Sequence, residues 1–399
     1  MPGGIPNPFG FDLSDFMRML QSPGPVNMEI ARSTAEAAAI VDLETNEPRP
    51  EPKIDPDQAR AFDDVVRAVQ LLVSDATGIT AALTVPGEAV DRTGWSHATL
   101  AGLEPVLGAL ARALGRSTGE TPADAGAPGM LSPEALIGMV MQQFMPPLLG
   151  LWAGSMIGLL SHRALGQYDL PLPLDAPPKL LFVVRNVEAF GTEWTLPLDE
   201  LRYALALREV VHGAQRSVPW VRARLVRLAS DYVSAYEVQT NAIEEQLGGF
   251  GFTFDPNDPG AMEAMARMSD PDLLLGAMQS ERQAPLLAEL QRTVAVLEGY
   301  TDVVVEAQGV RVGTAHGRID EALRRHRLER GEATGFVDRL LGLELDRTHY
   351  ESGVTFCRGV IERSDGQLDQ LNRLWSNEDL LPTQPELDAP GLWLARIDL

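Results

Sequence analysis

Five residues, Arg208 to His212, have types and a spacing close to those of a zinc-binding motif. They read Arg-Glu-Val-Val-His, which is H-E-x-x-H with its first His replaced by Arg. In the intact motif, two His at positions i and i+4 of a helix bind zinc from one face, and the Glu is the general base. A guanidinium has five donors and no lone pair to give a metal. The substitution removes one ligand and leaves His212 as a ligand candidate and Glu209 as a catalytic candidate.

A later pair of acidic residues lies where such a site would need a further ligand. Glu298 and Asp302 are four residues apart in a segment expected to be a helix over residues 284–308, so both carboxylates project from one face. The Glu-x-x-x-Asp spacing resembles that of gluzincin-type metallopeptidases, in which the Glu is the third zinc ligand and the Asp orients a ligand His. The alternative is a solvated charged face, but Val294 and Val305 on the same stripe favour burial.

The helix that carries the motif is expected over residues 199–215, with Asp199 as its N-cap. Four of its residues share one helical stripe: Leu201, Leu205, Arg208 and His212. This face is predicted to pack inward or to line a cleft. Taken alone, the motif also fits a helix at the edge of the core with an Arg–Glu network. In the later helix, Gly299 costs about 1 kcal/mol relative to Ala, which indicates the close approach of another element.

Most of the chain has helical periodicity, so we predict a mostly α protein with two or three short strands. Helix starts are expected at Asp55–Pro56 and close to Asn27, Ser96, Ser132 and Pro219. Strands are expected at 179–184 and 192–196, and an aromatic loop at 248–257. A Pro/Gly/Ala-rich linker at 117–129 is predicted to join an N-terminal helical region, 1–116, to a helical domain, 130–399.

The apolar segment 135–161 is predicted to be a buried helical hairpin. Pro146 and Pro147 divide it into pieces shorter than the roughly 20 residues that a bilayer requires. Gly150, Gly154 and Gly158 fit close helix packing as well as a transmembrane small-xxx-small pattern. We therefore expect no stable membrane insertion, and keep peripheral membrane association through 135–161 as a minor alternative.

Composition limits the partners and the compartment. The chain has 399 residues, 45% of them hydrophobic, and a net charge of −23, which argues against nucleic acid and anionic membrane surfaces as partners. Its single cysteine, Cys357, cannot form an internal disulfide, and a small buried residue is favoured over a nucleophile. The first nine residues have no signal-peptide pattern. Together these features predict a cytoplasmic protein.

Stretches along almost the whole chain carry a family resemblance. They are Gly3–Phe11, Gly24–Asn27, Leu165–Asp169, Arg208–His212, Val218–Trp220, Glu298–Tyr300, Phe356–Cys357, Leu374–Trp375 and Leu381–Thr383. In these stretches the chain is similar to an actinobacterial zincin-like family of hydrolases and zinc-dependent metalloproteases, related to proteins associated with deazaflavin-coenzyme biosynthesis. The resemblance implies a zincin-like fold, zinc held by His212 and Glu298, Glu209 as base, and a peptide or protein substrate.

Arg208 opposes the expectation of zinc, because a catalytic zinc usually needs three protein ligands. A distant histidine would have to complete the set, and no spacing nominates His97, His162, His316, His326 or His349. If the fold is retained, the guanidinium would instead face Glu298 and Asp302 and form an ion network with them. Two functions remain open: a zinc-dependent hydrolase, and a non-catalytic binding or scaffold protein with a degenerate site.

Overall fold

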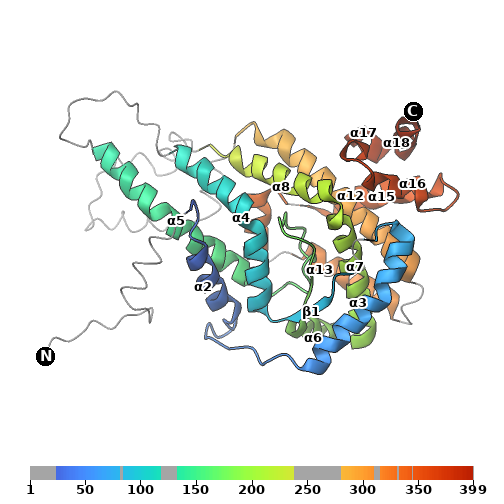
Figure 1. The fold of residues 1–399 in the computed structure, drawn as a ribbon, viewed down its shortest axis with the longest axis horizontal. Coiled ribbons are helices and arrows are strands. Elements are labelled where there is room, and N and C mark those ends of the chain that lie inside the picture. Colours follow the sequence, from blue (N-terminus) through green and yellow to red (C-terminus); the bar gives the residue numbers. More distant parts are fainter. Residues whose placement is uncertain are drawn as a thin grey trace.

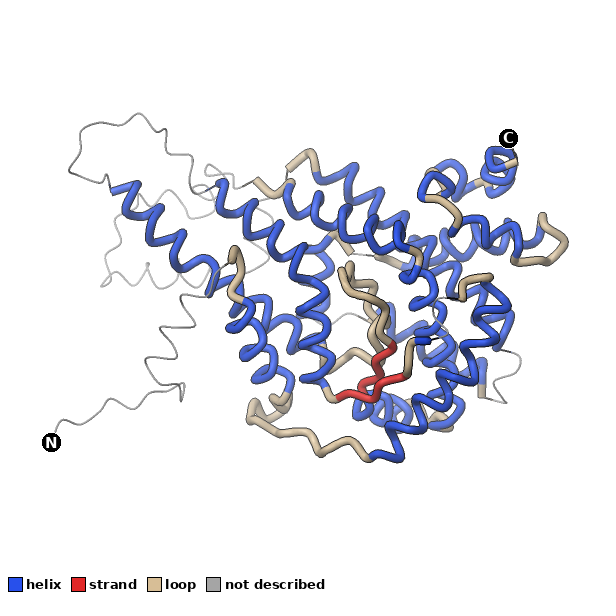
Figure 2. Tube along the Cα trace, viewed as in Figure 1, coloured by secondary structure: helices blue, strands red, loops and turns tan. Residues whose placement is uncertain are grey.

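The chain is mostly α, as predicted, in a computed structural model that describes residues 24–80, 84–117, 133–237, 280–309, 315–329, 332–343 and 345–398. Figure 2 shows helices throughout these ranges, with two short strands. Three predicted features lie wholly or largely outside them: the opening stretch 3–11, the linker 117–129 and the loop 248–257.

The motif helix, α7, lies among other helices rather than on the surface (Figure 1). The first half of the chain contains α2 (Met28–Ala39), α3 (Pro56–Thr77), β1 (Gly87–Val90), α4 (Arg92–Ser117), α5 (Pro133–Leu160), β2 (Leu180–Val183), α6 (Val184–Glu193), α7 (Leu198–Ser217) and α8 (Pro219–Ser234). The second half contains α12 (Gln283–Gly309), α13 (His316–Leu328), α14 (Glu332–Leu341), α15 (Arg347–Glu362), α16 (Asp369–Asn372), α17 (Gln384–Asp388) and α18 (Pro390–Ile397). Helices α3, α12 and α13 all pack against α7.

Local sequence signals explain the start and the end of α3. The Asp55 side chain accepts a hydrogen bond from the backbone N–H of Asp57 at 2.9 Å. The Gln58 side chain accepts one from the backbone N–H of Asp55, which completes a capping box. Gly78 ends the helix with φ +71°, in the left-handed region that favours glycine. The predicted start of this helix is therefore confirmed.

The two strands form a parallel pair beside the motif helix. Gly87 lies opposite Leu180 and Val90 opposite Val183. The predicted strand at 179–184 is confirmed, whereas β1 was not predicted because its sequence, Gly-Glu-Ala-Val, has one large apolar side chain. The strand predicted at 192–196 is wrong. Helix α6 continues to Glu193, and Thr195, at φ +51°, turns the chain toward α7.

The start of α7 also differs from the prediction. Pro197, not Asp199, is the N-cap residue, and its carbonyl accepts the N–H of Leu201 at 2.9 Å. The helix can begin before Asp199 because the carbonyl of Pro197 accepts the first helical hydrogen bond. Proline lacks the N–H donor but keeps the carbonyl acceptor. Asp199 lies in the first turn, where the helix dipole favours a negative charge.

Residues Pro133–Leu160 form one helix, α5, so the predicted hairpin is wrong. Pro146 and Pro147 lie inside this helix. Proline cannot donate the helical N–H bond, but α2 packs along α5 at this level and the N–H of Asn27 donates to the carbonyl of Pro146 at 2.9 Å. Packing against α2 is therefore compatible with a helix that continues past Pro146 and Pro147.

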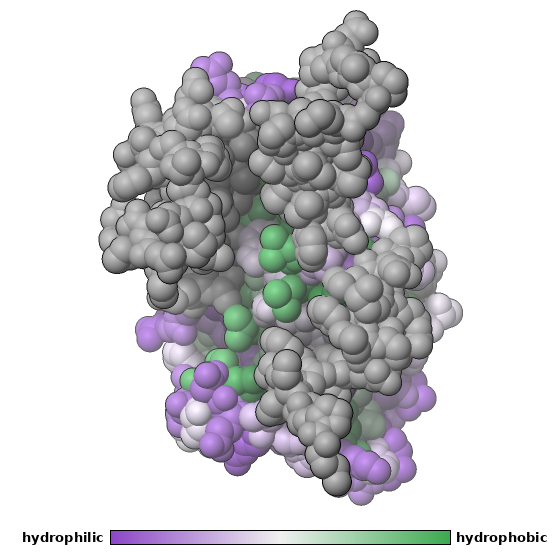
Figure 3. All heavy atoms as spheres, turned by 90° about the vertical axis from the view of Figure 1, so that its left-hand side faces the viewer, coloured by the Kyte–Doolittle hydropathy of each residue, from purple (hydrophilic) through white to green (hydrophobic). Residues whose placement is uncertain are grey.

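Close packing on α2 explains the three glycines of α5. A Cβ at Gly150, Gly154 or Gly158 would overlap the backbone carbonyl of Asn27, Ala31 or Ala35, respectively. In the described ranges, no helix is long and apolar enough to cross a membrane. Other apolar side chains of α5 are exposed, among them Leu148, Leu151 and Leu159. Figure 3 shows apolar side chains gathered on the face of the molecule on which α5 lies.

One hydrophobic core runs through both predicted regions. Its buried apolar residues extend from Val26 to Ile397 and form a single cluster. Helices α2 and α4 pack on α5, and α3 packs on α7, so residues on the two sides of the 117–129 segment share this core. Cys357 on α15 belongs to it, and its thiol is buried, in line with the expected small core residue.

Helix α12 crosses α15 at two glycines, which gives the close approach predicted from Gly299. A Cβ at Gly299 would overlap the backbone of Gly353, and a Cβ at Gly353 would overlap the carbonyl of Ala295. Because α12 carries Glu298 and Asp302, the close packing of α12 on α15 helps to determine where both carboxylates lie.

Gly353→Ala should lower the free energy of unfolding by about 1–3 kcal/mol, because the added methyl group forces two backbones apart. Urea denaturation measures the loss. The matched control is Gly317→Ala on α13, where a Cβ would have no neighbour within 4 Å; it should be neutral or slightly stabilising. Equal stability of the two variants would contradict the packing argument.

Candidate functional site

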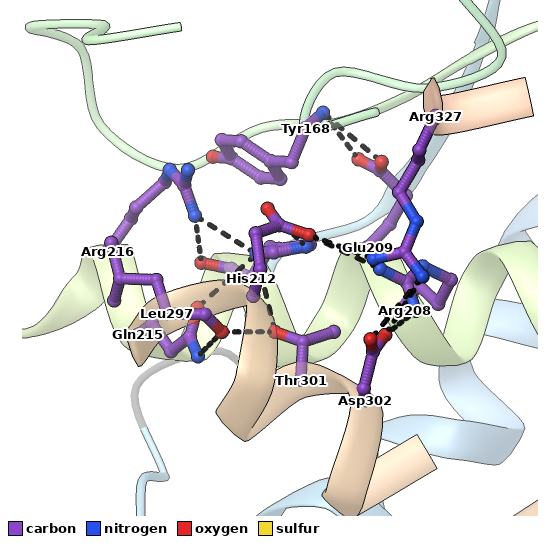
Figure 4. A network of polar contacts seen from close by, with 11 residues as sticks. Tyr168, Arg208, Glu209, His212, Gln215, Arg216, Leu297, Thr301, Asp302 and Arg327 are labelled. Carbon is purple, nitrogen blue, oxygen red and sulfur yellow. Dashed lines mark hydrogen bonds and ion pairs between the residues drawn. The ribbon is translucent and has the colours of Figure 1, made fainter. Parts of the chain in front are cut away.

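Two helices bring the sequence-predicted residues together, and a third helix and one loop complete the site (Figure 4). Helix α7 supplies Arg208, Glu209 and His212, and α12 supplies Glu298 and Asp302. All but Asp302 line one small cavity of about 10 Å³, which is about the space of one water molecule.

Arg208 faces both carboxylates of α12. Its Nη1 lies 2.6 Å from Asp302 Oδ1, and its Nη2 lies 3.4 Å from Glu298 Oε2. The side chains of Arg208 and Glu298 are only 11% and 4% exposed, so these charges interact largely away from water, where pairing matters most.

A second arginine, Arg327 of α13, completes the network and was not predicted. Its Nη1 lies 3.3 Å from Glu298 Oε2, and its Nη2 lies 3.2 Å from Asp302 Oδ1. Its guanidinium also lies 5.4 Å from the ring centroid of Tyr350. In the sequence, Arg327 ends the run Arg-Arg-His-Arg at 324–327, and nothing there relates it to the motif.

The pKa values of Asp302, Glu298 and Arg327 reflect both burial and the neighbouring charges. Burial alone would raise the pKa of Asp302, but Arg327 and Arg208 outweigh it and hold that pKa below its usual value. Burial raises the pKa of Glu298, and the same two arginines oppose the rise. Burial would lower the pKa of Arg327, but Asp302 and Glu298 raise it above its usual value. The two arginines therefore favour the ionised form of both carboxyl groups. At Asp302 they outweigh burial, whereas at Glu298 burial keeps the pKa above its usual value.

His212 lies beside the network as a neutral imidazole. Its Nε2 is 3.5 Å from Glu298 Oε1. Its Nδ1 is 3.2 Å from both Gln215 Oε1 and Arg216 Nη1. Burial, then Arg216 and Arg208, lower the pKa of His212 well below its usual value, so the ring does not compete with the arginines as a cation.

Glu209 is held by the loop before β2, not by the ion network. The N–H of Tyr168 donates to both of its carboxylate oxygens at 3.1 Å. A Cβ at Gly166 would overlap the same carboxylate, so the loop approaches this closely only with glycine there. Burial, with the charge of Asp169, raises the pKa of Glu209 to about 8. The loop belongs to the family-like stretch 165–169, but a backbone donor has no signature in residue types.

The donor set does not fit zinc. His212 and Glu298 are the two expected ligands that meet here, but two guanidiniums that would repel a cation already pair with Glu298. The carboxylate of Glu209 lines the same cavity and accepts the N–H of Tyr168. His326 pairs with Asp169, which lines the same small cavity, and its Nε2 is taken up by that contact at 3.1 Å. His162 contacts the carbonyl of Ala38 and His349 contacts Asp346, both away from the cavity lining. Across the part of the chain that the structure describes, no three His, Cys, Asp or Glu side chains come together to hold a metal ion.

A larger cleft lies on the outer side of the network. It has a volume of about 800 Å³, and α12, α13 and α15 provide its lining, a size typical of ligand pockets. Asp302 and Arg327 line it, so the network contributes to its wall. Charges of both signs line the rest, including the ion pairs Arg358–Glu306 at 2.7 Å and Arg347–Glu351 at 2.6 Å.

Comparisons with known proteins agree with this architecture. Residues 26–394 match the family described as zincin-like metallopeptidase. The fold is similar to the crystal structure of a candidate hydrolase with a novel fold from Chloroflexus aurantiacus, with a TM-score of 0.61 and 22% identity over 94% of this chain and 99% of that one. At that identity the likeness concerns the fold alone. The search of curated proteins gives no match.

Proposed function

Because this chain belongs to the zincin-like metallopeptidase family, we propose that it is a member in which a buried ion network takes the place of zinc, and that it acts as a non-catalytic binding protein. One observation carries the proposal. Arg208 and Arg327 both pair with Glu298 and Asp302, at the position where the motif and the later glutamate would hold a metal.

Charge balance supports the replacement. Two guanidiniums and two carboxylates sum to zero, as zinc and two carboxylates would. A zinc ion added beside both arginines would leave two uncompensated positive charges in a buried site, and unpaired buried charge is strongly destabilising. The arginines therefore meet the electrostatic need of Glu298 and Asp302 without a metal.

The partner that we propose is a peptide or protein segment with charged side chains, bound in the cleft of about 800 Å³. The ion pairs Arg358–Glu306 and Arg347–Glu351 have side chains that are more than half exposed. Such surface pairs contribute roughly 0–1 kcal/mol, so a charged segment can exchange them for its own pairs at little cost.

A zinc-dependent hydrolase is the second candidate, favoured by one observation: Glu209, His212 and Glu298 still line one cavity. In that case zinc would displace the arginines from Glu298, and Glu209 would act as base. This candidate and the proposed binding protein differ in metal content.

Metal analysis of protein purified without chelators, together with a peptidase assay on a mixed peptide substrate, separates the two candidates. We expect no stoichiometric zinc, no cleavage, and a melting temperature that EDTA leaves unchanged. One zinc per chain, removable by EDTA and accompanied by peptidase activity, would overturn the proposal in favour of the hydrolase.

Peptide binding tests the positive half of the proposal. Fluorescence polarisation with mixed-charge peptides should show binding that Arg358→Glu, in the cleft, weakens. Arg67→Glu is the control, since Arg67 forms a similar exposed pair on α3, away from the cleft lining. Equal binding by the two variants would rule out the cleft as the site.

A further inference from the structure

We infer that Arg327 is a second and independent barrier to zinc, so that restoring the motif by Arg208→His alone does not restore a metal site. This inference rests on the proposed function and extends it to a residue outside the motif. Under this inference, the fold could still form a zinc site, and the side chains of Arg208 on α7 and Arg327 on α13 each block it.

The first argument is that both arginines share one acceptor atom. Arg208 Nη2 and Arg327 Nη1 lie 3.4 Å and 3.3 Å from the same oxygen, Glu298 Oε2. With Arg208 removed, Arg327 still occupies that oxygen and still reaches Asp302 Oδ1 at 3.2 Å. The carboxylate of Glu298 would still be paired with a guanidinium, which cannot itself be a metal ligand because it has no lone pair to donate.

The second argument is that Arg327 is held in place. Its side chain is 10% exposed and lies between the two carboxylates of α12 and the ring of Tyr350 on α15. It lines both the small cavity and the large cleft. To admit a metal, the Arg327 side chain would have to break its contacts with the carboxylates of α12 and with Tyr350 of α15.

The third argument is electrostatic. A guanidinium stays protonated in proteins, so Arg327 opposes a divalent cation at Glu298 through like-charge repulsion in a site of low dielectric. It also binds Asp302, which would otherwise be free to orient a ligand, a contribution usually worth 10–100-fold in metal affinity. We expect removal of the Arg327 charge to raise zinc affinity by roughly 100-fold or more beyond that of Arg208→His.

The test compares four variants: Arg208→His, Arg208→His/Arg327→Leu, Arg208→His/Arg327→Gln and Arg208→His/Arg324→Leu. Arg324 is the matched control, because it lines the same cleft but pairs with Glu321 of its own helix. The Gln variant keeps a hydrogen-bond donor, which guards against a Leu variant that does not fold. Zinc chloride is titrated in competition with a chromophoric chelator, and each melting temperature is measured with and without zinc.

We expect the two Arg327 variants to bind one zinc and to melt at a higher temperature when it is present. Arg208→His and the Arg324 control should bind at least about 100-fold more weakly. Equal zinc affinity of Arg208→His and the Arg327 variants would overturn the inference and leave the proposed function intact, as would absence of zinc binding in both Arg327 variants. Zinc in the unsubstituted protein would instead overturn the proposed function.

Discussion

Arg208→Ala should lower the free energy of unfolding by roughly 3–5 kcal/mol, the usual loss when one side of a buried ion pair is removed. Glu298 and Asp302 would then share Arg327 alone, which can neutralise only one of them. Urea denaturation at pH 7 measures the change. Adding Glu298→Gln to Arg208→Ala should recover part of the loss, because the second substitution removes the charge that the first one stranded.

The control for this prediction is Arg67→Ala on α3. Arg67 also pairs with two carboxylates, at 2.7 Å and 2.9 Å, but its side chain is 62% exposed. Its removal should change stability by no more than about 1 kcal/mol. If Arg208→Ala lost as little as Arg67→Ala, the network would not be the element that holds these carboxylates in the protein interior.

Glu209→Gln should stabilise the protein above neutral pH. The folded-state pKa of Glu209 is about 8, and its usual value is 4.5. Between these values the unfolded chain releases the proton while the folded chain retains it, so stability falls as pH rises through this window. The slope is at most about 1.4 kcal/mol per pH unit, which gives an upper limit of roughly 5 kcal/mol by pH 8.

Glutamine is neutral at every pH and keeps an oxygen that can accept the N–H of Tyr168, so the variant should lack this slope. Unfolding free energies measured at pH 5 and pH 8.5 should differ less for Glu209→Gln than for the unsubstituted protein, and the variant should be the more stable at pH 8.5. Glu306→Gln, at a side chain that is 62% exposed, should leave the slope unchanged. Parallel pH profiles for all three proteins would contradict the raised pKa.

The parts of the site that lie on single helices could be predicted from sequence. Helical periodicity converts spacing into shared faces, so Arg208 and His212 on α7, and Glu298 and Asp302 on α12, could each be assigned to one face. Arg327 could not be found in this way, because its place depends on how α13 packs against α7 and α12. The Tyr168 N–H that binds Glu209 was equally hidden, since every residue except proline has that donor.

Tertiary packing also explains where local signals misled. Pro146 and Pro147 predicted a break, but α2 packs along α5 and the helix continues. Gly299 shows the opposite case. Its cost in a helix predicted a close neighbour, and the backbone of Gly353 is that neighbour. A residue that is unfavourable for its own helix therefore gave the better guide to a contact between helices.

The contact of two arginines with one oxygen of Glu298 has a consequence for the history of the protein. If the proposed function is correct, we expect that a lineage that exchanged a metal for two arginines would not return by one substitution. Reversal of either arginine alone would leave the other guanidinium on Glu298 and remove one of the two positive charges that face the carboxylates. We expect such an intermediate to be less stable than the present protein. The second arginine would therefore hinder a return to a metal site by single substitutions.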